Sequence, residues 1–115
     1  MNKFRRKDLK EVLKSFGELK DMDSKAEVLS TLEWAHQTTQ TCADEEEDSF
    51  NNLPESFQFS SRADRFTEAI DELTDAYCEI EDLAGEVEEM EQFDYKSILP
   101  AIESITAKIQ NAIRK

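Results

Sequence analysis

The chain has 115 residues, which is long enough to bury one hydrophobic core but short for two. Two Gly and two Pro provide too few turn residues for the many tight reversals of a β-sandwich or barrel, so the composition indicates an all-α fold. The formal net charge of −13 disfavours direct nucleic-acid binding, because phosphate backbones repel an acidic surface.

Membrane contact and a cysteine framework are also disfavoured. No apolar run approaches the roughly 18 residues of a membrane span, and the first residues lead into an amphipathic segment rather than a signal peptide. Cys42 and Cys78 lie far apart with no C-x-x-C spacing, which argues against a disulfide scaffold or a thiolate metal site. We therefore expect no membrane contact and a chain that needs neither disulfides nor bound metal.

The charge is distributed unevenly along the chain. Residues 1–20 carry a net +4 and residues 96–115 a net +3, whereas residues 21–60 carry −9 and residues 61–95 carry −11. The acidic middle would attract a basic protein surface, and only the short basic N-terminal segment suits nucleic acid.

The first two helices are predicted from apolar spacing and a cap. One apolar stripe with steps of three and four residues predicts a helix over 7–20, formed by Leu9, Val12, Leu13, Phe16 and Leu19. Ser24 and Glu27 form a capping-box pattern, which predicts the start of a second helix over 24–50. Its inward face is expected to hold Val28, Leu29, Leu32, Ala35 and Cys42.

Residues 51–60 are predicted to form the corner after the second helix. Pro54 pushes the residue before it out of helical geometry, and Asn51 and Asn52 tolerate the left-handed turn that closes a helix. We expect Leu53, Phe57 and Phe59 to cover the end of the bundle.

The third helix, predicted over 61–91, has the most regular pattern. Ser60 or Ser61 is expected to cap it, and Gly85 is expected to permit a bend or a close helix crossing. Spacings of four and three alternate through a coiled-coil seam formed by Phe66, Ile70, Leu73, Tyr77, Ile80, Ala84 and Val87. Further apolar residues beside the seam favour contact with more than one neighbouring helix.

A fourth helix is predicted over 97–114. Ser97 is expected to cap it and Pro100 to lie in its first turn, where a missing N–H is harmless. Its stripe consists of Ile98, Ile102, Ile105, Ile109 and Ile113. The chain is therefore predicted to be one all-α domain over 1–115, an antiparallel bundle of about four helices dominated by a long helical hairpin.

Two metal-binding patterns fall short of a complete site. The run from Asp44 to Asp48 lacks the alternating acids and the turn Gly of an EF-hand loop. Glu33 and His36 form one E-x-x-H unit, whereas di-iron bundles use two such units and two further Glu. A solvated acidic face and an ordinary histidine are the simpler interpretations.

A second alternative is enzymatic. Glu45 and Asp48, followed by Glu68 and Asp71, resemble the E-x-x-E and E-x-x-D pairs of the all-α nucleoside-triphosphate pyrophosphatases related to MazG. The resemblance implies Mg²⁺-dependent release of pyrophosphate from a nucleotide. Asp48 departs from the pattern, which has Glu there, and only Arg62 and Arg65 are near enough in sequence to serve the phosphates.

A second family resemblance covers roughly residues 44–80. The acidic helix end, Asn52-Leu53-Pro54-Glu55 and the following Ala69-Ile70-Asp71 are similar to small acidic helical-hairpin proteins of bacteriophages and mobile elements. That resemblance implies a non-catalytic protein in the cytoplasm of a bacterial host. It also implies an inhibitor of the anti-defence or anti-CRISPR kind, which imitates nucleic acid.

The acidic residues are expected to form the partner-binding surface that this hypothesis requires. Carboxylates at three- and four-residue steps form rows along one side of the third helix, and such rows attract a Lys/Arg-lined channel. The predicted partner-binding residues are Asp44, Glu45, Glu46, Glu47, Asp48, Glu68, Asp71, Glu72, Asp75, Glu79, Asp82, Glu86 and Glu89. We expect a basic, nucleic-acid-binding protein as the partner, and no cofactor, bound metal or catalytic residue. The simpler alternative is that these acids only keep the exterior of the helix soluble. A further alternative is a structural oligomer joined through the 66–90 seam.

Overall fold

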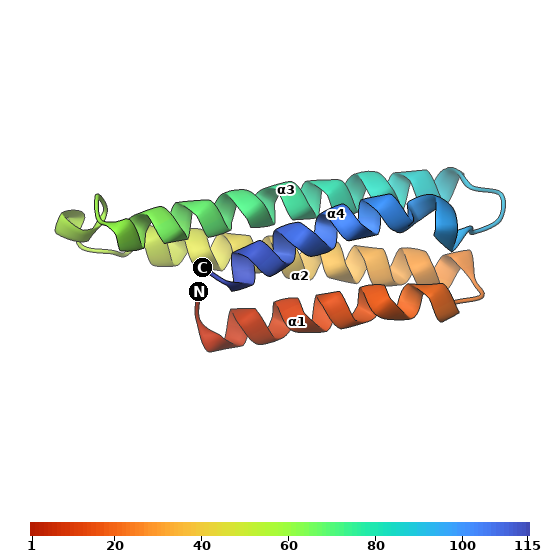
Figure 1. Cartoon of the computed structure of the whole chain (residues 1–115), viewed down its shortest axis with the longest axis horizontal. Helices are drawn as coiled ribbons and strands as arrows, with labels where there is room; N and C mark the ends of the chain where they lie inside the picture. The colour runs from red at the N-terminus through yellow and green to blue at the C-terminus, as the bar shows by residue number, and fades with distance from the viewer.

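The computed structural model describes residues 1–115 and contains only helices and connecting turns (Figure 1). Four α-helices and two short 3₁₀ helices follow one another as α1 (Lys3–Glu18), η1 (Leu19–Asp21), α2 (Lys25–Asn51), η2 (Glu55–Phe57), α3 (Ser61–Glu89) and α4 (Tyr95–Ile113). The all-α prediction is confirmed.

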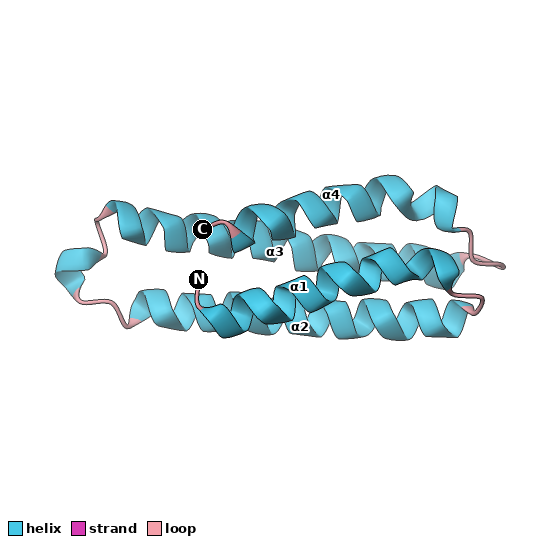
Figure 2. Cartoon of the chain, turned by 60° about the horizontal axis from the view of Figure 1, so that its bottom comes forward, coloured by secondary structure: helices cyan, strands magenta, loops and turns pink.

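The helices form an antiparallel bundle in which each helix reverses the direction of the one before it (Figures 1 and 2). The contacting pairs are α1 with α2, α2 with α3, α3 with α4, and α4 with α1. Helices α1 and α3 therefore lie diagonally across the bundle from each other. The molecule is a rod with extents of 54 × 21 × 18 Å.

The core follows the apolar stripes of all four helices. The seam of α3 is used inside the chain, because Leu73, Ile80 and Val87 are fully buried. Nineteen residues form one buried cluster, to which α4 contributes Ile98, Ile102, Ile105, Ile109 and Ala112. An oligomer joined through the α3 seam would therefore first have to open the bundle.

Two helices begin earlier than predicted because a residue upstream caps them. The Asn2 side chain accepts a hydrogen bond from the Arg5 N–H at 2.9 Å, so α1 starts at Lys3 rather than at residue 7. The Asp94 side chain accepts from the Lys96 N–H at 3.2 Å, so α4 starts at Tyr95 rather than at residue 97. The first-turn assignment of Pro100 was consequently wrong, since Pro100 lies inside the helix.

The corner between α2 and α3 differs from the prediction in backbone and packing. Asn52 closes α2 with a right-handed backbone, and no residue has a positive φ, so the left-handed turn is absent. Phe57 and Phe59 are 52% and 90% exposed, so they do not cover the end of the bundle. The reason is visible in Figure 1, where the α2–α3 hairpin extends beyond the shorter α1 and α4 and no further element covers its tip.

Helix α2 begins after Ser24, whose side chain accepts from the Glu27 N–H at 3.3 Å, as the capping pattern predicted. At the other end of the hairpin, Lys25 Nζ donates to the carbonyl oxygens of Glu88 and Met90, the latter at 2.8 Å. A cation there offsets the negative end of the α3 dipole. None of the helices has the length and apolar composition needed to cross a lipid bilayer.

Candidate functional site

The acidic run at the end of α2 is divided between core and surface. Glu46 is fully buried, and its Oε1 accepts a hydrogen bond from Arg5 Nε at 2.8 Å and forms an ion pair with Arg5 Nη2, also at 2.8 Å. The same Arg5 guanidinium donates to Ser49 Oγ at 3.1 Å. Placing Glu46 among the partner-binding residues was wrong, because its carboxylate joins α1 to α2 inside the protein.

Glu46 belongs to a buried row of α2 that the sequence already contained. Ala35, Thr39, Cys42 and Glu46 are separated by four, three and four residues, and all four are buried. The periodicity that predicted Ala35 and Cys42 as inward-facing thus extends to Glu46. This periodicity was overlooked because Glu46 lies within a run of five acidic residues.

The remaining acids of the run are exposed, and one of them is drawn towards α1. Asp44, Glu45, Glu47 and Asp48 are exposed, and Glu45 Oε2 lies 3.9 Å from Arg5 Nη1, on the side of α2 that faces α1. On α3, in contrast, Glu68 and Glu79 border α4. We therefore take the candidate surface from the exposed acids of α3 alone.

Two of the predicted α3 acids are partly neutralised by lysines at the border with α4. Glu68 Oε2 pairs with Lys115 Nζ at 2.7 Å, and Glu79 Oε2 pairs with Lys108 Nζ at 2.7 Å. The hydrogen bond to Glu79 raises the pKa of Lys108. Half-buried Glu79 also accepts from Ser104 Oγ at 3.2 Å, so its role in this structure is to join α3 to α4.

Five exposed acids form a stripe on the outer side of α3 with no cation of the chain beside them. No Lys, Arg or His nitrogen lies within 4.0 Å of any of their carboxylates. We call this stripe the α3 acidic row, and it consists of Asp71, Asp75, Asp82, Glu86 and Glu89. Glu72, the other predicted residue, is half-buried beside the row.

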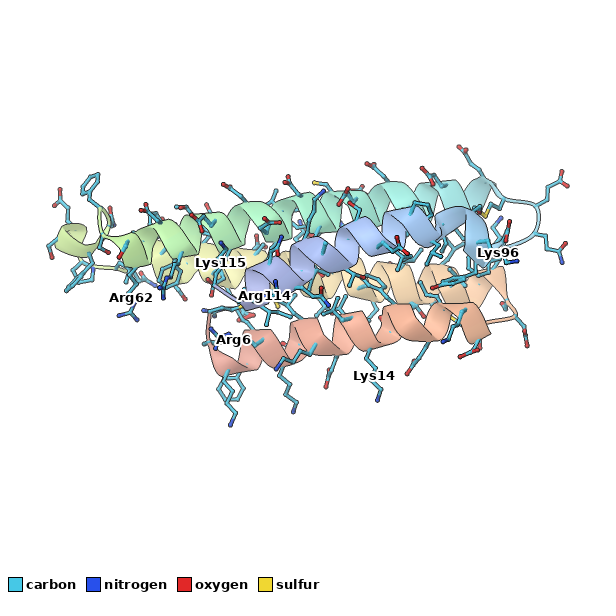
Figure 3. The ribbon with its side chains drawn as sticks, in the orientation of Figure 1. Arg6, Lys14, Arg62, Lys96, Arg114 and Lys115 are labelled. Atoms are coloured by element: carbon cyan, nitrogen blue, oxygen red, sulfur yellow. The ribbon has the colours of Figure 1, made fainter.

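The arrangement of the helices explains why the row stays unpaired. Helix α1 carries six basic and three acidic residues, a net +3, whereas α3 carries two basic and eleven acidic residues, a net −9. Because α1 lies diagonally opposite α3, its cations cannot reach the row (Figure 2). Lys14, labelled on α1 in Figure 3, points away from α3.

Two further residues lie beside or within the row. His36 of α2 lies edge-on to Tyr77, with ring centroids 5.7 Å apart, and its Nε2 is 3.7 Å from Glu81 on the α2 side of α3. Cys78 is exposed and free. It follows Asp75 by three residues and precedes Asp82 by four, so it lies on the same face as the row.

The metal-binding alternatives gain no support from the geometry. No three His, Cys, Asp or Glu side chains are grouped closely enough to hold a metal ion. Glu45 is beside Arg5 of α1 and Glu68 is beside Lys115 after α4, so the first acids of the two pairs in the pyrophosphatase pattern have partners from different parts of the chain. His36 contacts Glu81 and Tyr77 rather than a second E-x-x-H unit.

Comparison with protein-family models, with curated proteins and with solved structures finds no match.

Proposed function

We propose that this chain is a non-catalytic interaction protein that docks the α3 acidic row onto a basic, nucleic-acid-binding surface of another protein. The single observation that supports this function is an exposed row of carboxylates without intramolecular cations, in a bundle whose basic helix lies diagonally opposite. In this proposal the row blocks nucleic acid from the partner by steric and electrostatic occlusion, as an inhibitor of a host defence protein would.

The charge density of the row is more than half that of a nucleic-acid strand. Residues 71–89 span about 27 Å of helix axis at about 1.5 Å per residue. The row places five carboxylates over that length, where one strand of B-form DNA places about eight phosphates at about 3.4 Å each. A groove that binds a phosphate backbone would therefore meet five negative charges in place of about eight.

The row is also preorganised, because the helix that carries it is packed in the bundle before any partner binds. The opposite face of α3 contains Leu73, Ala76, Ile80, Leu83 and Val87, all buried in the bundle core. A carboxylate on a packed helix loses less backbone freedom on binding than one on a flexible tail, and this preorganisation favours affinity. Electrostatic attraction would add to the association rate and would weaken as salt screens the charges.

The test begins with capture of binding proteins by the immobilised chain, followed by competition. The captured protein should be released by a duplex oligonucleotide and by raised salt. A variant carrying Asp71→Asn, Asp75→Asn and Asp82→Asn should bind about tenfold or more weakly, because it removes three of the five charges in the row.

A matched control removes three exposed acids elsewhere. The control variant carries Asp23→Asn, Glu27→Gln and Glu33→Gln, which changes the net charge equally but lies outside the row. The proposal requires this control to bind like the unmodified chain. Equal loss in both variants would show that total charge, not the row, drives binding, and a captured protein indifferent to nucleic acid would refute the occlusion mechanism. Mg²⁺-dependent release of pyrophosphate from nucleoside triphosphates would instead favour the enzymatic alternative.

A further inference from the structure

A basic hollow lies on a different side of the molecule from the α3 acidic row, at the beginning of α3 next to the tip of the α2–α3 hairpin. Its volume is about 300 Å³, and its lining residues are Met1, Ser61, Arg62, Arg65, Phe66 and Lys115. The beginning of α1, the beginning of α3 and the end of α4 all border it. Figure 3 shows Arg62, Arg114, Lys115 and Arg6 along this part of the molecule.

The register of α3 explains why a cation projects into the hollow. Arg62 precedes Ala69 by seven residues, and Ala69, Ala76 and Leu83, which follow one another at the same interval, are buried against the bundle axis. Arg62 therefore occupies the next position of a core row. Because α1 and α4 are too short to accompany this part of α3, the position faces a hollow instead of apolar neighbours.

The arginines at the hollow lack acidic partners in a strongly acidic protein. The chain has 27 acidic residues, yet neither Arg62 nor Arg65 has a carboxylate oxygen within 4.0 Å. Lys115 shares its charge with Glu68 at 2.7 Å. The buried Glu46 nearby is already bound by Arg5. The hollow thus keeps two unpaired guanidinium groups, and the positive end of the α3 dipole adds to their field.

An aromatic side chain completes the lining. Phe66 is half-buried and packs against Phe50 of α2, with ring centroids 6.4 Å apart. A ligand held by the arginines would therefore meet an apolar wall beside its charged group. A volume of about 300 Å³ is at the lower end of the range for small-molecule pockets.

We propose that this hollow binds a small organic phosphate ester, with Arg62 and Arg65 holding the phosphate and Phe66 contacting the apolar part. The planar guanidinium group matches two phosphate oxygens at once, which gives arginine its preference for phosphate. This site is independent of the proposed function, because it lies on the axis-facing side of α3 and the acidic row lies on the outer side.

Calorimetric titration with phenyl phosphate, inorganic phosphate and phenol tests this site. Phenyl phosphate should bind saturably, inorganic phosphate more weakly, and phenol not at all. A variant carrying Arg62→Gln and Arg65→Gln should bind phenyl phosphate at least about tenfold more weakly, since it removes both unpaired guanidinium groups. Both residues are exposed, so the variant should keep the thermal unfolding midpoint of the unmodified chain.

Matched controls separate this site from general attraction to positive charge. Lys14→Gln and Lys96→Gln together remove two exposed cations that do not line the hollow, and this variant should bind phenyl phosphate normally. Arg62→Lys and Arg65→Lys should retain part of the affinity, because the charge remains but the paired donors are lost. Absence of saturable binding, equal affinity in the glutamine variant, or binding only to a long oligonucleotide would overturn the proposal.

Discussion

At the scale of single residues, the most informative contact is the buried ion pair between Arg5 and Glu46. Both side chains are removed from water, and Oε2 of Glu46 has no hydrogen-bond partner. A buried pair is weak evidence for stability by itself, because desolvation offsets much of the attraction. Removing one partner destabilises the protein more strongly, since the remaining buried charge then loses its buried counter-charge.

We therefore predict that Glu46→Gln lowers the free energy of unfolding by about 3 kcal/mol, because the buried Arg5 guanidinium then has only the exposed Glu45, 3.9 Å away, as a charged partner. Urea denaturation measures the change, and Glu47→Gln serves as the exposed control, with an effect within about 0.5 kcal/mol. Replacing both partners together, Arg5→Met with Glu46→Leu, should recover most of the loss. A neutral Glu46→Gln would mean that the pair is not buried in solution.

The two cysteines should differ sharply in reactivity. Burial raises the pKa of the Cys42 thiol to about 12, whereas Cys78 is exposed. A thiol reagent at mildly alkaline pH should modify one cysteine in the folded protein and both in denaturant, with Cys78→Ala abolishing the fast reaction. Rapid modification of two thiols without denaturant would contradict the burial of Cys42.

The raised pKa also has a consequence for stability. An unfolded cysteine loses its proton near pH 8.5, while folded Cys42 keeps its proton up to about pH 12. Between these values the folded state binds one proton more than the unfolded state, so the contribution of this thiol to stability falls as pH rises. Cys42→Ala should remove this part of the alkaline dependence of the unfolding free energy, and an unchanged slope would contradict it.

At the scale of helices, the apolar periodicity of the sequence predicted α3 most accurately. Its seam predicted the presence of the helix, and the end at Glu89 is two residues from the predicted end. The buried face is displaced from the seam, since Leu73, Ile80 and Val87 are buried together with Ala69, Ala76 and Leu83, whereas the other seam residues are half-buried. The starts of α1 and α4 were missed because the capping residues Asn2 and Asp94 act from just outside the apolar stripes. The exposed Phe59 could not be predicted either, because its burial depends on the relative lengths of helices that are distant in sequence.

A substitution at Gly85 tests the contribution of α3 to stability. It lies on the exposed side of α3, and a Cβ built there meets no atom within 4 Å, so it does not permit a close helix crossing. Gly85→Ala should raise the free energy of unfolding by about 1 kcal/mol, because alanine loses less backbone freedom in a helix. This corresponds to a thermal midpoint about 4 °C higher for a chain of this size.

Gly17 offers a comparison for the same substitution. It also has open space around its Cβ position, but it lies in the last turn of α1, where helices fray. Gly17→Ala should therefore stabilise less than Gly85→Ala. A destabilising Gly85→Ala would indicate that α3 bends at this residue in solution.

At the scale of the whole molecule, the bundle separates charge as well as burying apolar surface. The order of the helices places basic α1 and acidic α3 on opposite corners, so that α4 supplies the two lysines that pair with α3 acids. The sequence indicated both the basic ends and the acidic middle. It could not indicate that Glu46 would be buried in the core while Asp71, Asp75 and Asp82 remain without a cationic partner. That outcome depends on which helices become neighbours.

The most direct test of the α3 acidic row uses Cys78 as a reporter within it. The rate of modification of Cys78 by a thiol reagent should be measured for the free protein and for its complex with the captured basic partner, at low and high salt. We predict that the partner slows the reaction strongly at low salt, and that raised salt or the Asp71→Asn, Asp75→Asn, Asp82→Asn variant restores the free rate. A saturated complex in which Cys78 reacts as fast as in the free protein would place the contact elsewhere and contradict the proposed function.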